Sequence, residues 1–184
     1  LGTGVGSGII LDGRLLHGAH GMGGELGHMI VQPDGEQCGC GQKGCLERYT
    51  SATYLARCAR RRIEVDGAAG ALADVLARRG KISAKDVAEA RDEGDKLAEE
   101  VWDRAMTYLA IACVNICRIL DPDLIVLGGG MAGAGDSLLQ PLREHFAALH
   151  WRLDEPRTSL VLATLGNDAG VIGAAGAAWQ EFGP

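Results

Sequence analysis

The chain has 184 residues, of which 47% are hydrophobic and 23% charged, a composition that predicts a globular domain or lobe with a substantial core. The net charge of −6 and the lack of a basic stripe argue against nucleic-acid binding, and no apolar run is long enough to span a bilayer. Six cysteines and no secretory signal favour a reducing compartment, so we expect a cytoplasmic protein.

The first part of the chain reads as a hairpin followed by irregular structure. Residues 8–11 form an apolar strand, Asp12-Gly13 is a strong two-residue turn signal, and residues 14–16 return. A Gly-rich loop over 17–27 then leads into a predicted short strand over 28–31. A cysteine-containing segment follows this strand.

The middle of the chain is predicted to be helical. Residues 50–62 read as a helix with Thr50 or Ser51 as its N-cap. Residues 66–94 read as short helices that end at Gly80 and Gly94, and the run from Ser83 to Asp86 resembles a capping box. The strongest helical signal covers 95–120, where apolar residues recur at helical spacing until Asp121-Pro122-Asp123 stops it.

The last third alternates strands and helices. The apolar run at 124–127 is typical of a strand buried on both faces, and a second strand is expected at 160–163. Helices are expected at 138–150 and, small-residue rich, at 170–181. Asp168 is either a polar group on the nucleotide side or the N-cap of the last helix, and the cap is preferred. This succession predicts a parallel α/β layer, in which ligands sit at the carboxyl ends of strands.

Three thiols and one imidazole predict a zinc site. The ligand set consists of His28, Cys38, Cys40 and Cys45, and Cys₃His is a common structural set for tetrahedral Zn²⁺. Glycines between the cysteines suit a tight turn. The alternatives are a disulfide, which we rank below zinc because of the spacing and the missing signal peptide, and unrelated thiols.

Two Gly-rich loops are candidate ligand sites. The loop from Gly2 through Thr3 and Gly4 to Gly8 would bring backbone N–H groups to an anion, with the Thr3 and Ser7 hydroxyls adding donors. It is neither a Walker A nor a Rossmann loop, and it equally fits a plain strand entry. Gly128-Gly129-Gly130 would let a flat ligand approach the backbone, or is a flexible turn.

Two carboxylates lie near the predicted zinc ligands. Glu25, His28 and Glu47 could accept hydrogen bonds from a polyol, because ionised carboxylates are acceptors only. The alternative, a pair of ordinary surface glutamates, is more serious for Glu47 than for Glu25, which is embedded in Gly23-Gly24-Glu25-Leu26-Gly27-His28.

Together these motifs resemble the ROK family of repressors and sugar kinases, and are most similar to its zinc-containing bacterial glucokinases. The resemblance extends in order from residues 1–8 through 24–28 and 38–47 to 121–130. It implies an α/β, actin-like (ribonuclease H-like) ATPase lobe, with a mixed sheet, flanking helices and a zinc knuckle at 28–47. It also implies sugar contacts from Glu25, His28 and Glu47.

The same resemblance assigns the nucleotide side and the cofactors. Gly2, Thr3 and Gly4 would face the phosphates of ATP, and Gly128, Gly129 and Gly130 would lie by the nucleoside. The cofactors implied are Mg²⁺ with ATP and a structural Zn²⁺ held by His28 and the three cysteines. The expected activity is phosphorylation of a hexose, glucose to glucose 6-phosphate, by a homo-oligomer (dimer or tetramer).

Two family motifs do not occur in this chain. The first phosphate loop, Asp-x-Gly-Gly-Thr, and the Asn-Asp pair that includes the catalytic base would both lie upstream of Leu1. We therefore expect residues 1–184 to be a C-terminal lobe that is inactive alone. The alternatives are a sugar-sensing repressor, a kinase for N-acetylmannosamine, N-acetylglucosamine or fructose, and a zinc module without a ligand.

Overall fold

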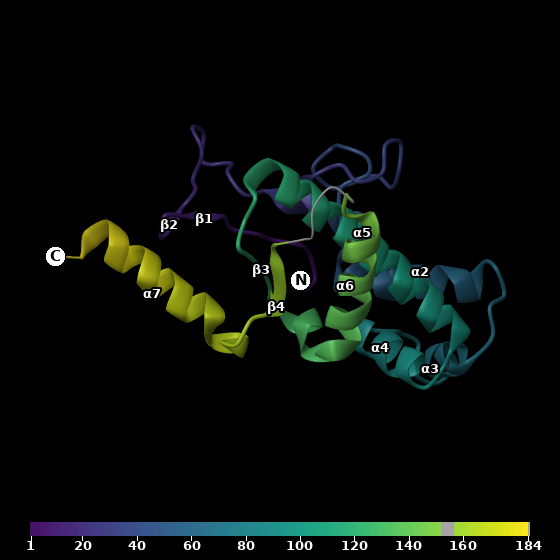
Figure 1. Cartoon of the computed structure of the whole chain (residues 1–184). Coiled ribbons are helices and arrows are strands. Elements are labelled where there is room, and N and C mark those ends of the chain that lie inside the picture. Colours follow the sequence, from purple (N-terminus) through teal and green to yellow (C-terminus); the bar gives the residue numbers. More distant parts are fainter. Residues whose placement is uncertain (152–156, 184) are drawn as a thin grey trace.

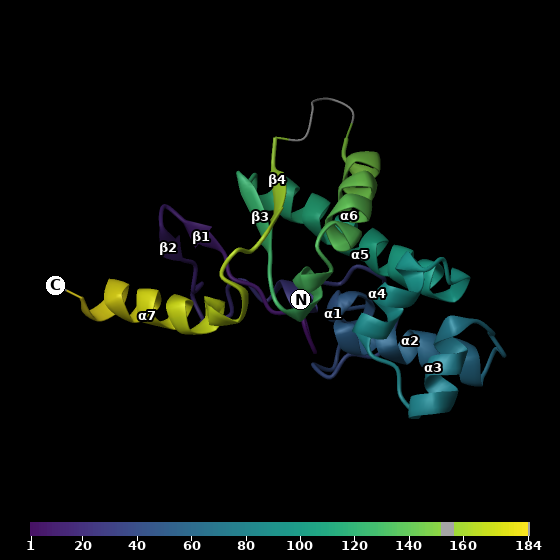
Figure 2. The same cartoon turned by 90° about the horizontal axis from the view of Figure 1, so that it is seen from below.

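The computed structural model describes residues 1–151 and 157–183 of the chain (Figure 1). In chain order the elements are β1 (Ile10–Leu11), β2 (Arg14–Leu15), the 3₁₀ turn η1 (Leu26–His28), α1 (Glu47–Thr50), α2 (Ala52–Glu64), α3 (Ala71–Arg79), α4 (Ala84–Asp92), α5 (Lys96–Leu120), β3 (Leu124–Leu127), η2 (Gly130–Ala134), α6 (Asp136–Leu149), β4 (Ser159–Leu162), η3 (Gly166–Asp168) and α7 (Ala169–Phe182). Helices α2 to α6 form one body, and α7 projects away from it (Figures 1 and 2).

Local capping signals fix the helix starts as the sequence predicts. The Ser51 side chain accepts a hydrogen bond from the backbone N–H of Tyr54, which begins α2. Ser83 and Asp86 form a reciprocal capping box at α4. The Asp95 side chain accepts from the backbone N–H of Ala98 at the start of α5, and this helix ends at Leu120, followed by Asp121 as C-cap with a left-handed φ of 45°. The helix expected over 95–120 is confirmed.

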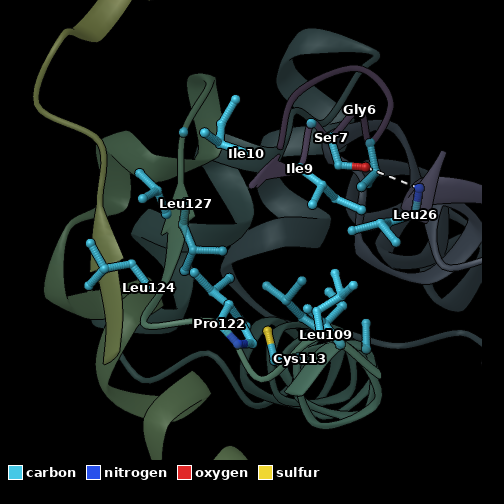
Figure 3. A pocket seen from close by; sticks show the side chains of 18 of the residues that line it. Gly6, Ser7, Ile9, Ile10, Leu26, Leu109, Cys113, Pro122, Leu124 and Leu127 are labelled. Atoms are coloured by element: carbon cyan, nitrogen blue, oxygen red, sulfur yellow. Dashed lines mark hydrogen bonds between the residues drawn. The ribbon is translucent and has the colours of Figure 1, made fainter. Parts of the chain in front are cut away.

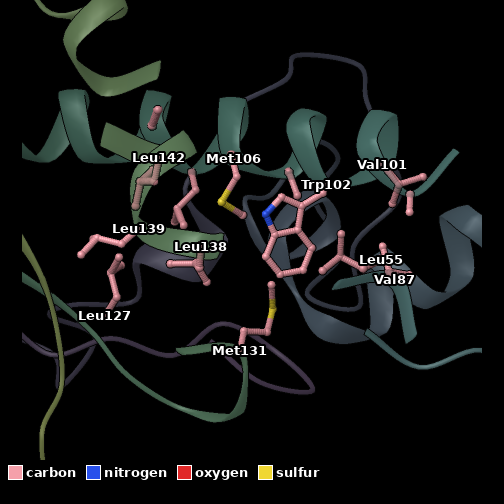
Figure 4. Packing of buried hydrophobic residues seen from close by; sticks show 14 of the residues in the cluster. Leu55, Val87, Val101, Trp102, Met106, Leu127, Met131, Leu138, Leu139 and Leu142 are labelled. Carbon is pink, nitrogen blue, oxygen red and sulfur yellow. The ribbon is translucent and has the colours of Figure 1, made fainter. Parts of the chain in front are cut away.

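The core lies where α5 meets α2, α4 and α6 (Figure 4). Trp102 of α5 is 2% exposed, and its indole lies among labelled side chains in Figure 4 that include Leu55 of α2, Met131 of η2 and Leu138 of α6. The large side chains that are essentially fully buried include Leu55, Leu72, Val87, Val101, Met106, Leu138 and Leu142. Burying a side chain of this size contributes roughly 1.5–3 kcal/mol, so these residues hold the helical body together.

A proline inside α6 is accommodated by hydrogen bonds from other helices. Pro141 has no N–H to donate to the carbonyl of Ser137, four residues earlier. The Trp102 indole N–H donates to this carbonyl oxygen at 3.0 Å, and Arg91 of α4 donates to it as well. These two hydrogen bonds therefore satisfy a partly buried carbonyl and join α4, α5 and α6.

The strands form two separate two-stranded pieces in the described part of the chain. β1 and β2 pair antiparallel around Asp12 and Gly13, both at positive φ, so the predicted hairpin is confirmed with short strands. β3 and β4 pair parallel, with Leu124 opposite Ser159 and Leu127 opposite Leu162. The Arg143 guanidinium of α6 donates to the carbonyl oxygen of Leu160 at 2.7 Å, which ties this pair to the helical body.

Three expectations are corrected. Residues 28–31 do not form a strand: Leu26–His28 is a 3₁₀ turn, and only Ile30 makes an isolated bridge, to Cys45. β3 is not buried on both faces: Ile125 and Leu127 face the core, whereas Leu124 and Val126 on the other face are 55% and 56% exposed, because nothing in the described chain covers that face. Asp168 stands at the N-cap of α7, but its side chain accepts no capping hydrogen bond.

Helix α7 contributes nothing to the core of the described chain. None of its residues is buried, and its exposed apolar side chains are Val171, Ile172, Trp179 and Phe182. Its described side-chain hydrogen bond runs from the Gln180 amide to the Gly13 carbonyl of the hairpin. In the described residues, no helix combines the length and the apolarity needed to cross a membrane.

Candidate functional site

Four predicted metal ligands converge in space. The ligand atoms of His28, Cys38, Cys40 and Cys45 all lie within 4.8 Å of one another. The Cys38 sulfur is 3.7 Å from Nδ1 of His28, and the sulfurs of Cys40 and Cys45 are 3.6 Å apart. Zinc–sulfur bonds of about 2.3 Å in a tetrahedron place neighbouring sulfurs roughly 3.8 Å apart, so the donor set fits a zinc ion.

Backbone hydrogen bonds within the chain hold the cysteine segment in its conformation. The N–H of Cys38 donates to the carbonyl of Gln42 at 2.8 Å, and the N–H of Leu46 donates to the carbonyl of Met29 at 2.9 Å. Gly44 has φ +81°, and a Cβ there would overlap the carbonyl of Gln32. A glycine is therefore required at the point where the segment doubles back.

The local environment shifts the pKa values of two of the thiols in opposite directions. The pKa of Cys40 is lowered to about 7, first of all because the backbone N–H of Gln42 donates to its sulfur. Burial raises the pKa of Cys45 to about 12. A dication among these sulfurs would favour the thiolate at both positions, since a coordinating thiol is deprotonated outright.

An aromatic pair fastens the cysteine segment to the helical body. Tyr49 of α1 is 1% exposed, and its hydroxyl accepts from the backbone N–H of Glu36 at 2.6 Å. Its ring stacks on Tyr108 of α5 with centroids 4.3 Å apart. The Tyr108 hydroxyl donates to the side-chain oxygen of Gln32 at 3.0 Å. The sequence reasoning missed this anchor, because the partners are up to 76 residues apart.

Glu47 opens α1 immediately beyond the last cysteine and contacts the first Gly-rich loop. Its Oε2 accepts from the backbone N–H of Val5 at 2.9 Å, and a Cβ on Gly4 would overlap this carboxylate. Glu47 is half-buried. A half-buried carboxylate with a backbone hydrogen bond is not an ordinary surface glutamate.

Glu25 and His28 flank the 3₁₀ turn η1. Glu25 is exposed at the N-terminal end of this turn, and within residues 1–151 and 157–183 its carboxylate accepts no capping hydrogen bond. His28 is half-buried at the other end, and its backbone N–H donates to the carbonyl of Glu25 at 3.1 Å. One short turn therefore carries an exposed carboxylate at one end and, at the other, an imidazole whose Nδ1 lies 3.7 Å from the Cys38 sulfur.

Ser7 has a different role from the one expected. Its hydroxyl donates to the carbonyl of Gly24, and its oxygen accepts from the backbone N–H of Leu26 at 3.0 Å (Figure 3). Because the hydroxyl hydrogen is used in this way, Ser7 does not supply a donor to an anion. Its side chain instead connects the first Gly-rich loop to the turn that carries Glu25.

The N-terminal loop also contacts the other predicted ligand segments. The Leu1 amino group donates to the Gly128 carbonyl at 2.8 Å, and the N–H of Met131 donates to the Leu1 carbonyl at 3.1 Å. The N–H of Ala52 and the hydroxyl of Thr53 donate to the carbonyls of Gly2 and Thr3, respectively. Gly2, Thr3 and Gly4 are thus held between the Gly128–Gly130 segment and the start of α2.

A cavity of about 670 Å³ lies behind the first Gly-rich loop (Figure 3). It lies between residues 5–12, one side of α5 and the strand β3. Apolar side chains dominate its lining, among them Ile9, Leu109, Cys113 and Leu127. None of Glu25, His28 and Glu47 lines it, so this cavity is not the candidate sugar site.

Comparison with known proteins shows the family of the chain. Residues 1–181 match the ROK family. A glucokinase from Halalkalibacterium halodurans is 45% identical over 174 residues, which are 94% of this chain and 52% of the relative. An N-acetylmannosamine kinase from Salmonella typhi is 32% identical over 173 residues, 94% of this chain and 53% of the relative. The chain thus spans about half the length of these curated relatives.

Solved structures are similar in fold. A ROK glucokinase from Streptomyces griseus, in complex with glucose and AMPPNP, superposes with a TM-score of 0.83 at 33% identity, covering 98% of this chain and 59% of that one. A ROK transcriptional regulator, a homologue of the E. coli MLC protein, gives 0.80 at 32% identity, covering 96% and 43%. The described fold is therefore that of the actin-like ROK sugar kinases, and the chain belongs to the ROK family.

Proposed function

We propose that this chain forms the sugar-binding lobe of an ATP-dependent glucokinase, which converts glucose to glucose 6-phosphate. The observation that carries the proposal is the direct hydrogen bonding between one Gly-rich loop and both carboxylate-bearing segments, through Val5–Glu47 and Ser7–Leu26. A phosphoryl donor and a sugar acceptor must lie this close for in-line transfer. The 45% identity to a glucokinase favours glucose as the sugar.

Three side chains would bind the sugar. The Glu25 carboxylate is exposed and not used in capping its own turn, so it can accept from sugar hydroxyls. Glu47 uses one oxygen for Val5, which leaves the other for a hydroxyl. His28 would contact the sugar while one ring nitrogen faces the cysteine sulfurs.

The metal group would be structural zinc. All four tetrahedral positions are supplied by His28, Cys38, Cys40 and Cys45, so no position is left for an activated water. What these residues would do is fix the imidazole of His28 and the start of α1, which carries Glu47. A zinc knuckle without a ligand is disfavoured, because the half-buried Glu47 carboxylate is held against the first Gly-rich loop by the Val5 N–H, as a shared ligand site would require.

Residues 2–4 and 128–130 would face ATP. Thr3 is exposed, and the backbone of this loop is held in place by α2 and by Leu1. Mg²⁺ accompanying ATP would neutralise phosphate charge. The catalytic Asp and the first phosphate loop would come from a further lobe, as the chain spans 52% of its glucokinase relative and exposes apolar side chains on β3 and α7. Alone, residues 1–184 would be inactive.

The setting of the enzyme is part of the proposal. All six cysteines are free thiols, which favours the reducing cytoplasm. The acidic charge of −6 favours a protein that does not bind nucleic acid through this lobe. We propose a homo-oligomer, dimer or tetramer.

A coupled ADP-release assay on the full-length protein tests the function. Glucose, N-acetylmannosamine, N-acetylglucosamine and fructose are compared with ATP and Mg²⁺, and kcat/KM is expected to be highest for glucose. Glu25→Gln should lower kcat/KM for glucose at least about tenfold, because a lost charged hydrogen bond costs about 1.4 kcal/mol or more. Glu99→Gln, an exposed change on α5, is the matched control and should leave kcat/KM unaltered.

Two results would reject the glucokinase proposal. A higher kcat/KM for N-acetylmannosamine than for glucose would point to the activity of the Salmonella relative. No turnover of any sugar, together with DNA binding that responds to sugar, would point to a regulator like the one of similar fold.

A further inference from the structure

We propose that Ser7 is a positioning residue that makes sugar binding and nucleotide binding mutually favourable. This inference rests on the proposed function and goes beyond it, because Ser7 itself would touch neither ligand. Its hydroxyl is used in both directions, donating to the Gly24 carbonyl and accepting from the Leu26 N–H at 3.0 Å.

The two backbone partners of Ser7 are the immediate neighbours of Glu25. The bond to Leu26 joins residues 19 positions apart in sequence, so it is a tertiary contact. The same N–H also donates to the Gly24 carbonyl at 2.7 Å in a local turn around Glu25, and the Ser7 hydroxyl attaches both groups of this turn to the Gly-rich loop. The orientation of the Glu25 carboxylate therefore depends on where the Gly-rich loop holds Ser7.

The other side of the same loop is fixed by Glu47. Its carboxylate accepts from the Val5 N–H at 2.9 Å, two residues before Ser7. Gly4, the last of the residues proposed to face phosphate, packs against this carboxylate. Three residue steps span at most roughly 10 Å, so the loop connects the two proposed sites over a short, hydrogen-bonded path.

Binding of one ligand should therefore order the segment that the other ligand needs. A sugar that bridges Glu25 and Glu47 would hold the loop from both sides, through Ser7 and through Val5. A nucleotide that binds next would lose less conformational entropy at residues 2–4. Linkage requires the reverse effect of the same size, so a nucleotide would tighten sugar binding by an equal factor.

Calorimetric titration of the full-length protein with AMPPNP, with and without saturating glucose, measures this coupling. In the wild type we expect glucose to tighten AMPPNP binding by about fivefold or more. Ser7→Ala should bring this ratio close to one and change AMPPNP affinity without glucose by less than about twofold. Ser7→Thr, which keeps the hydroxyl, should restore the ratio.

The control is Ser137→Ala, which removes a hydroxyl bonded to Asp92 in the helical body and should keep the wild-type ratio. If Ser7→Ala does not fold, as judged by metal content and circular dichroism, Ser7→Cys replaces it and should also lower the ratio. A wild-type ratio in a folded Ser7 variant overturns the inference, as does a ratio of one in a wild type that phosphorylates glucose. A wild type that binds no glucose overturns the proposed function itself.

Discussion

The helical body and the loop side of this molecule are held together by different forces. In the helical body, helices α2 to α6 bury large apolar side chains such as Trp102, Leu72 and Leu138 to 2% exposure or less. The loop side, residues 1–8 and 24–47, buries few of them. It depends on backbone hydrogen bonds, required glycines and four converging metal ligands.

The difference shows which part of the chain can hold its shape by itself. The helical body buries most of its large apolar side chains within the described residues, although Ile119 of α5 and Leu149 of α6 stay exposed. The loop side would depend on the zinc ion proposed for it, and β3 and α7 leave apolar side chains uncovered. Substitutions in the two regions should therefore affect different properties, metal content on the loop side and the free energy of unfolding in the helical body. Three substitutions test this contrast.

The largest effect is expected at the metal ligands. Cys40→Ala should lower the zinc content from about one equivalent per chain to near zero, because structural zinc contributes roughly 10–16 kcal/mol of apparent binding energy. The helical signal should change little, since α2 to α6 do not use the metal. Elemental analysis and far-ultraviolet circular dichroism measure the two regions separately.

Cys58→Ala is the matched control, because this half-buried thiol lies on α2 outside the cluster. It should keep the full zinc content. A disulfide between Cys38 and Cys45 in the wild type would contradict the metal assignment.

A core substitution should show the opposite pattern. Trp102→Ala should lower the free energy of unfolding by about 3–5 kcal/mol, because it leaves a cavity and removes a partner from the Ser137 carbonyl. Trp179→Ala on α7, where the side chain is 68% exposed, should stay within about 0.5 kcal/mol. Urea unfolding of residues 1–184 compares the pair, and equal losses would disprove the stated position of the core.

The smallest effect concerns the pH dependence of the helical body. Burial raises the pKa of Asp86, but hydrogen bonds from Ser83 and the charge of Arg79 outweigh it, so the pKa lies below its usual range. A lowered carboxyl pKa stabilises the fold above the unfolded value of about 3.9, and this stability is lost as the pH falls toward the folded value.

Asp86→Asn should therefore cost about 1 kcal/mol at pH 7 through the weakened cap, and the deficit should shrink below about pH 4. Urea unfolding at pH 7 and at several values below 4 measures the difference. Asp74→Asn, at an exposed position of α3, is the control and should show no such convergence. A deficit that is constant with pH would show that the charge of Asp86 is not involved.

Sequence patterns predicted the parts of this molecule that depend on residues only a few positions apart. The caps at Ser51, Ser83 and Asp95, the long helix and the hairpin all follow from residues within a few positions of one another. The convergence of the four metal ligands follows from their spacing. The identity of the bound metal and the roles of Glu25, Glu47 and the Gly-rich loops remain predictions.

Contacts between distant segments could not be predicted from the same patterns. The apolar run after His28 indicated a strand, but Ser7 and Val5 hold the segment before it as a turn. The exposure of Leu124 depends on what packs over β3, which its own sequence does not specify. The hydrogen bonds from Tyr108 to Gln32 and from Trp102 to the Ser137 carbonyl join residues that only the tertiary fold brings together.

The hydrogen bond from Leu1 to the Gly128 carbonyl has a consequence for the order of folding. It joins residues 127 positions apart, whereas the helices α4, α5 and α6 pack against partners that follow them closely along the chain. Local contacts form quickly, and closing a long loop is slow because its entropy must be overcome first. The Gly-rich loop is therefore expected to reach its place after the helices have assembled. A binding-competent site would then mark the last step of folding.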